Sequence, residues 1–68
     1  MSKIAAIALD GPFEVDVDVA EWVSIFIMDD FEEGSPVAVY STHAAGIRDC
    51  QRIAAQRRIE FVDDSTPL

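Results

Sequence analysis

The sequence predicts an α+β domain in which one amphipathic helix packs on a mostly antiparallel sheet of about five strands. Two observations lead to this fold class. Most of the chain consists of short stretches rich in β-branched and aromatic residues, which favour strands, separated by residues that favour turns. One stretch, residues 42–57, instead places apolar residues at helical spacing. With 68 residues, we expect a single domain (residues 1–68) of marginal stability.

The first part of the chain predicts two strands joined by a turn. Residues 3–9 are a run of isoleucine and alanine, and residues 10–12 (Asp-Gly-Pro) are a strong turn signal. Residues 13–19 alternate between apolar and acidic side chains, which is the period of a strand with one buried face. We expect the apolar set to enter the core, namely Phe13, Val15, Val17 and Val19. The acidic set would form a row on the outer face, namely Glu14, Asp16 and Asp18.

Residues 22–28 are compatible with two structures. Their β-branched and aromatic residues favour a third strand. Alternatively, residues 18–21 resemble a capping box that would begin a helix ending at Gly34. We prefer the strand, because a helix would place the acids that follow residue 28 at the negative end of its own dipole. Those acids then lie in a hairpin loop, where Phe31 either packs on the core or is exposed.

Residues 37–40 predict a fourth strand, and Ser41 or Thr42 can cap the helix of residues 42–57. Gly46 costs about 1 kcal/mol relative to alanine inside a helix, which indicates close packing. The inner face of the helix is formed by Ala44, Ile47, Cys50 or Gln51, Ile53 and Ala54. Its outer side and C-terminal end carry Arg48, Arg52, Arg57 and Arg58.

The C-terminal residues predict a closing strand at residues 59–62 and a frayed tail at residues 63–68. The predicted core is Ile4, Ile7, Leu9, Val15, Val17, Val19, Val23, Ile25, Ile27, Val37, Val39, Ile47, Ile53 and Phe61.

Charge is the property in which this chain departs most from an ordinary small domain. Thirteen acids and five bases give a net charge of −8. Lys3 is the one base before residue 48, and the arginines all fall within residues 48–58. Nucleic acids and anionic lipids should repel such a protein, so we expect no direct nucleic-acid or membrane binding and a basic protein as partner. The alternative is that the acids serve solubility alone.

The sequence predicts no enzyme, cofactor or metal site. Ser41 and Thr42 precede the one histidine, His43, but helix capping explains these hydroxyls and no glycine-rich nucleophile turn is present. A single histidine and a single cysteine supply too few ligands for zinc, and Cys50 is expected to be a buried, inert thiol. One cysteine allows no intrachain disulfide. Without a signal peptide or membrane segment, we expect a cytoplasmic protein, a monomer rather than a homodimer.

The acids suggest one specific binding surface. Residues two apart on a strand are separated by about 6.6 Å, which is close to the spacing of charge along a nucleic-acid backbone. An acidic row of this kind could occupy a basic groove built for DNA, unless Arg48 and Arg52 lie across it and make it structural. The alternative is that the row is only the polar side of a half-buried strand. The candidate partner-binding residues are Glu14, Asp16, Asp18, Glu21, Asp29, Asp30, Glu32 and Glu33.

The size, the acidity, the layout of one helix on a sheet and the lack of catalytic residues resemble the small phage-encoded anti-CRISPR proteins. This resemblance covers the whole chain in character and includes no shared motif. It implies an inhibitor that binds a basic groove of a bacterial CRISPR–Cas complex in the host cell, by competing with DNA. A structural or assembly module that pairs through an exposed strand edge is the alternative, and an antitoxin-like regulator is a third possibility.

Overall fold

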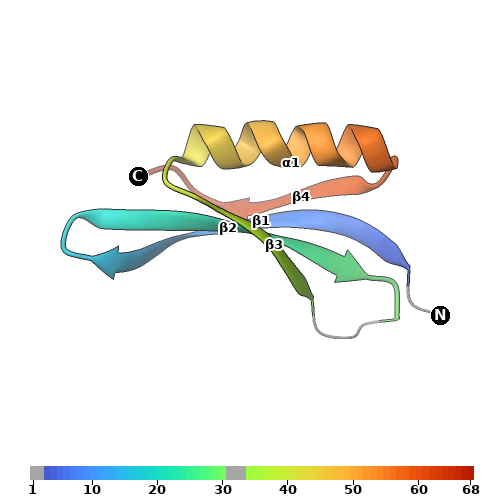
Figure 1. Cartoon of the computed structure of the whole chain (residues 1–68), viewed down its shortest axis with the longest axis horizontal. Coiled ribbons are helices and arrows are strands. Elements are labelled where there is room, and N and C mark those ends of the chain that lie inside the picture. The colour runs from blue at the N-terminus through green and yellow to red at the C-terminus, as the bar shows by residue number, and fades with distance from the viewer. Residues whose placement is uncertain (1–2, 31–33) are drawn as a thin grey trace.

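A computed structural model describes residues 3–30 and 34–68 as two layers, a four-stranded sheet and a helix on one of its faces (Figure 1). The order along the chain is β1 (Ile4–Asp16), β2 (Val19–Met28), β3 (Ser35–Tyr40), α1 (His43–Arg57) and β4 (Glu60–Ser65). The order across the sheet is β3-β2-β1-β4. Strands β1–β2 and β2–β3 pair antiparallel, whereas β4 runs parallel to β1. The α+β class with one helix is confirmed, but the sheet is mixed and has four strands in the described part of the chain.

One strand fewer is present because residues 10–12 do not form the predicted turn. β1 continues through Gly11 and Pro12, and its register with β2 shifts between Asp10 and Phe13. Gly11 has a φ of 129°, and a Cβ there would lie 2.9 Å from Cδ1 of Trp22. A glycine is therefore required both by the backbone conformation and by the close approach of Trp22.

The predicted strand at residues 22–28 is confirmed as part of β2, so the alternative helix is wrong. Phe31, Glu32 and Glu33 lie outside the described residues, and the prediction for Phe31 stays a prediction. At the C-terminus, the prediction of a frayed tail from residue 63 is wrong for its first residues. β4 extends to Ser65, and the Thr66 amide donates to the carbonyl of Gly11 at 3.1 Å.

The predicted helix is confirmed. Of its predicted inner face, Ile47, Cys50, Ile53 and Ala54 lie in or against the core, but the prediction is wrong for Ala44, which is exposed, and Gln51, the alternative to Cys50, is exposed as well. Thr42 is the N-cap, and its hydroxyl accepts a hydrogen bond from the Ala45 amide at 3.2 Å. At the other end Arg58 adopts the left-handed conformation, with a φ of 55°. Gly46 faces the sheet, where a Cβ would lie 2.9 Å from Cδ1 of Leu9, so this glycine does mark close packing. No helix in the described residues has both the length and the apolar character needed to cross a membrane.

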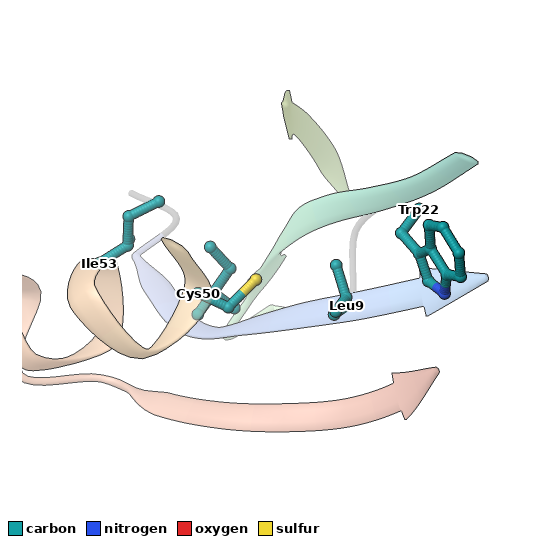
Figure 2. Close-up of a cluster of buried hydrophobic side chains, with 5 residues drawn as sticks. Leu9, Trp22, Cys50 and Ile53 are labelled. Carbon is teal, nitrogen blue, oxygen red and sulfur yellow. The ribbon is translucent and has the colours of Figure 1, made fainter. Parts of the chain in front are cut away.

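The core lies between α1 and the sheet. Figure 2 shows Leu9, Trp22, Cys50 and Ile53 in this cluster, which Ile7 completes. Of the predicted core residues, Ile7, Leu9 and Ile53 are buried, and Val37, Ile47 and Phe61 pack against the cluster. Ile4, Val23 and Ile25 are half-buried. The prediction is wrong for five exposed residues, namely Val15, Val17, Val19, Ile27 and Val39.

Candidate functional site

The end of β1 and the start of β2 form a hairpin, residues 13–20, that projects beyond the N-terminal end of α1 (Figure 1). We call it the hairpin arm. Every residue from Phe13 to Val19 is exposed. The prediction that Phe13 and the arm valines enter the core is therefore wrong, because α1 does not reach them. Their valine-rich alternation still makes the chain extended, since valine favours strands wherever it lies.

The turn of the hairpin arm is made by Val17 and Asp18. The Val17 amide donates a hydrogen bond to the Asp16 carboxylate at 2.7 Å. Asp18 has a φ of 57°, in the left-handed region that aspartate tolerates better than most residues. Two of the predicted acids thus shape the turn as well as charging it.

The predicted row of three carboxylates on one face is wrong. Glu14 pairs with Ala20, whereas Asp16 pairs with Val19, because the register shifts between them. Paired residues share a face, and the neighbours Ala20 and Val19 point to opposite faces of β2. Glu14 and Asp16 therefore lie on opposite faces of the hairpin arm. Glu21 pairs with Phe13 and shares the face of Asp16. The hairpin arm therefore carries negative charge on both faces and at its tip.

The other predicted acids do not join this surface. Asp29 and Asp30 follow the far end of β2, and nine residues along a strand span about 30 Å. The Asp29 carboxylate accepts a hydrogen bond from the Lys3 amide at 3.1 Å, and the Asp29 amide donates to the Lys3 carbonyl at 2.9 Å. Glu32 and Glu33 lie outside the described residues. The structure thus separates Asp29 and Asp30 from the hairpin arm.

The arginines do not lie across the hairpin arm. Arg52 forms a salt bridge with Asp49 at 2.5 Å, and Arg57 lies over the ring of Phe26, 5.0 Å from its centre. α1 runs away from the hairpin arm, which places Arg57 and Arg58 at the opposite end of the molecule (Figure 1). Among the described residues, no salt bridge joins an arginine to a carboxylate of the hairpin arm. Arg48 lines a hollow with Tyr40, Asp49 and Arg52. In the described part of the chain neither Arg48 nor Arg52 forms a salt bridge with the hairpin arm, so the condition that would have made these acids structural is not met.

The C-terminal residues flank the base of the hairpin arm. The indole Nε1 of Trp22 donates a hydrogen bond to the Thr66 carbonyl at 3.0 Å. A hollow of about 430 Å³ lies beside this point, lined by Pro12, Glu14, Asp18, Val19, Ala20 and Leu68. These lining residues include no lysine or arginine, so the hollow has no cationic group to bind an anion.

The hydroxyl that meets His43 belongs to Ser65, not to Ser41. Nε2 of His43 lies 2.9 Å from Oγ of Ser65, and that hydroxyl donates to the Asp63 carboxylate at 2.5 Å. This bond holds the pKa of Asp63 below its usual range. The hydroxyl of a nucleophilic serine would donate its hydrogen bond to the histidine, whereas the Ser65 hydroxyl donates to the Asp63 carboxylate. The contacts fix β4 against α1, and sequence reasoning missed them because Ser65 lies in the segment expected to fray.

A second polar chain links β2, β3 and α1. The buried Ser24 hydroxyl lies 3.0 Å from the Tyr40 hydroxyl, which donates to the Asp49 carboxylate. Burial, then this bond, raises the pKa of Tyr40 to about 12. The bond from Tyr40, then the bond from Arg52, lowers the pKa of Asp49. These groups are satisfied by each other and act as structural links between the layers.

No metal centre is formed by the described residues, which contain no group of three or more potential histidine, cysteine or acidic ligands. Cys50 is fully buried, and burial raises the pKa of its thiol to about 11. That thiol is therefore protonated at neutral pH and unreactive. Searches among protein-family models, curated proteins and solved structures gave no match to this chain.

Proposed function

We propose that this protein is a non-enzymatic inhibitor that inserts the hairpin arm into the nucleic-acid-binding groove of a basic protein. Following the resemblance to anti-CRISPR proteins, the partner we propose is a DNA-binding subunit of a CRISPR–Cas complex in the bacterial cytoplasm. One observation carries the proposal. Glu14, Asp16 and Asp18 are exposed on a projecting hairpin, and no described arginine pairs with them.

The shape of the hairpin arm supports insertion better than contact through one flat face. From Phe13 to the turn, the hairpin extends about 13 Å. A groove that holds a nucleic-acid strand is lined with positive charge along the path of the backbone. Acids on both faces and at the tip can meet both walls of such a groove. Affinity should therefore fall steeply as salt is raised.

A charge-matched pair of variants tests the proposal. The test variant neutralises the hairpin arm with Glu14→Gln, Asp16→Asn and Asp18→Asn. Asparagine keeps an acceptor for the Val17 amide and tolerates the left-handed conformation of residue 18. The control variant gains the same three charges on exposed positions of α1, namely Ala44→Lys, Gln51→Lys and Ala55→Lys. Both variants have a net charge of −8 + 3 = −5.

The measurement is the affinity of a purified CRISPR–Cas DNA-binding complex for its target DNA, with increasing amounts of each variant. The wild type and the α1 control should displace the DNA, and the neutralised variant should lose displacement by at least about tenfold. Equal displacement by the two variants would show that only net charge matters. If the wild type displaces no DNA, the protein is used to capture binding proteins from a bacterial lysate with and without added DNA. A captured basic protein that is lost on adding DNA indicates another partner with a nucleic-acid groove, and the absence of any captured protein contradicts the proposal.

Pairing through a strand edge, the alternative function, has less support. The β4 edge carries Glu60, Asp63 and Asp64 among its six residues, and the β3 edge contains Pro36. Charges and proline on an edge strand are features that block pairing with another chain. A dimer that survives high salt in size-exclusion chromatography would nevertheless favour this alternative.

A further inference from the structure

The face of the sheet opposite α1 is not covered by any described segment (Figure 1). Ile7, Leu9 and Trp22 face the helix, so their neighbours along each strand face the other way. The pairings of Ala8 with Ile25 and Val62, and of Val23 with Val39, place these residues together on the uncovered side. We call this side the open face. Its apolar residues are Ala6, Ala8, Val23, Ile25, Ile27, Val39 and Val62.

The open face presents a continuous apolar area. Val39 is 59% exposed and Ile27 37%, and Val23, Ile25 and Val62 are half-buried. These residues come from β3, β2 and β4, and the small, buried Ala6 and Ala8 of β1 lie between β2 and β4. They therefore form one surface and not scattered single positions. A contiguous exposed apolar surface on a small protein marks an interaction site.

The charges on the open face indicate which kind of partner fits it. Asp10 pairs with Val23 and with Asp64, and Glu60 pairs with Ala6, so these three acids share the open face. Glu21, two residues before Val23 on β2, lies on the same side. In the described strands β1, β2, β3 and β4, no lysine or arginine is present. The open face therefore combines an apolar centre with a negative border.

A second copy of this chain is a poor occupant. Two open faces packed together would bring one acidic border against another, with no base from any described strand between them, and like charges at an interface are strongly unfavourable. A partner with an apolar stripe flanked by lysine or arginine would instead gain attraction along the border. Charge complementarity thus favours a basic amphipathic segment.

We propose that the open face binds a basic amphipathic helix of another protein, so that the sheet is covered by helices on both sides. The sheet has the dimensions for one helix per face. Four strands span about 14 Å across, and a helix with side chains is about 10–12 Å wide. On the opposite face, the 15-residue helix α1 already occupies this width. This proposal concerns a different surface from the hairpin arm and does not depend on its function.

The test uses the full chain and a synthetic helical peptide of about 18 residues, with leucines on one face and lysines on its flanks. A matched peptide carries glutamates in place of the lysines. Amide chemical shifts of the ¹⁵N-labelled protein locate each binding site. We expect the basic peptide to bind at least about tenfold more tightly than the acidic one and to shift the amides of the open face, with those of α1 unchanged.

Two double variants separate the open face from general hydrophobicity. Val39→Thr with Ile27→Thr reduces apolar area on the open face, and Val17→Thr with Leu68→Thr does so at exposed positions elsewhere. The first pair should weaken peptide binding at least about tenfold and the second should leave it unchanged. Equal binding of the two peptides would overturn the proposal. Chemical-shift changes confined to α1 or the hairpin arm would also overturn it, and the wild-type protein is enough to detect them. Sedimentation of the protein as a dimer in which the open face is buried would overturn it as well.

Discussion

Replacing Tyr40 with phenylalanine should destabilise the fold by removing one hydroxyl between the layers. That hydroxyl donates to the Asp49 carboxylate and contacts the buried Ser24 hydroxyl. Ser24 keeps the Ala38 amide as a donor at 3.1 Å, so the change leaves it with a partner. A hydrogen bond to a charged group contributes about 1.5–3 kcal/mol, and the partial exposure of Asp49 favours the lower end. We therefore expect a loss of about 1.5 kcal/mol at pH 7 from a domain whose total stability is about 3–10 kcal/mol.

The effect of Tyr40→Phe should depend on pH. The pKa of Asp49 is lower in the folded state than its ordinary value of 3.8, mainly through the Tyr40 hydrogen bond. A lowered pKa stabilises the fold above the unfolded value, and this contribution is lost as pH falls through the folded value. Phenylalanine removes the main cause of the shift, so the difference in free energy of unfolding between the two proteins should be constant from pH 5 to 8. It should shrink below about pH 4.

Urea denaturation at pH 7, 5 and 3 measures this difference, and thermal melting should show a fall of about 6–12 °C at pH 7. A double-mutant cycle with Asp49→Ala isolates the pair, and the coupling energy should be about 1 kcal/mol or more at pH 7. Zero coupling at pH 7, or a destabilisation that stays the same from pH 7 to pH 3, would refute the assigned role of this bond.

Two further predictions follow from the packing of α1. Gly46→Ala should lower the free energy of unfolding by about 1 kcal/mol, measured by urea denaturation, because the added Cβ meets the fully buried Leu9 at 2.9 Å. Alanine favours helices, so a more stable variant would contradict this packing. Cys50 should react with a thiol reagent at pH 8 only at the rate of unfolding, because burial raises the pKa of its thiol to about 11. Complete labelling of the folded protein within seconds would contradict this burial.

The parts of the fold that sequence reasoning predicted correctly are those in which local signals agree. At Thr42 a capping side chain begins a run of helical periodicity, and both belong to the same helix in the structure. Residues 22–28 combine β-branched and aromatic residues, and the acids after residue 28 disfavour a helix through its dipole, so both signals indicate the strand that is present.

The errors arose where one signal suits two structures. Residues 10–12 have the composition of a turn, but glycine and proline also fit an irregularity within a long strand, and Trp22 packing on Gly11 is a tertiary contact that no local pattern contains. The true turn at Val17 and Asp18 has neither glycine nor asparagine, so the alternating pattern concealed it. The register shift within the hairpin arm, which separates Glu14 from Asp16, has no sequence signal either.

An alternating apolar pattern also does not show whether the apolar face of a strand is covered in the folded protein. That depends on how much of the sheet the single helix covers. α1 has 15 residues and is about 22 Å long, whereas the 13 residues of β1 extend about 43 Å. The helix therefore covers β1 only as far as the base of the hairpin arm, and it covers one face of the sheet. Val15, Val17 and Val19 are exposed on the hairpin arm, and Val39 is exposed on the open face, because the described residues form no second helix to cover them.

Because α1 leaves the hairpin arm uncovered, the acids on the hairpin arm have a structural role that does not depend on any partner. A projecting hairpin of exposed valines would pair with other hairpins, and charges along its strands oppose such pairing. The carboxylates of Glu14, Asp16 and Asp18 would be useful on the hairpin arm even if it bound nothing. Protection against pairing and DNA mimicry therefore predict the same acidity for the hairpin arm. The decisive comparison is between the two variants of net charge −5, because they differ only in whether charge is removed from the hairpin arm or added to α1.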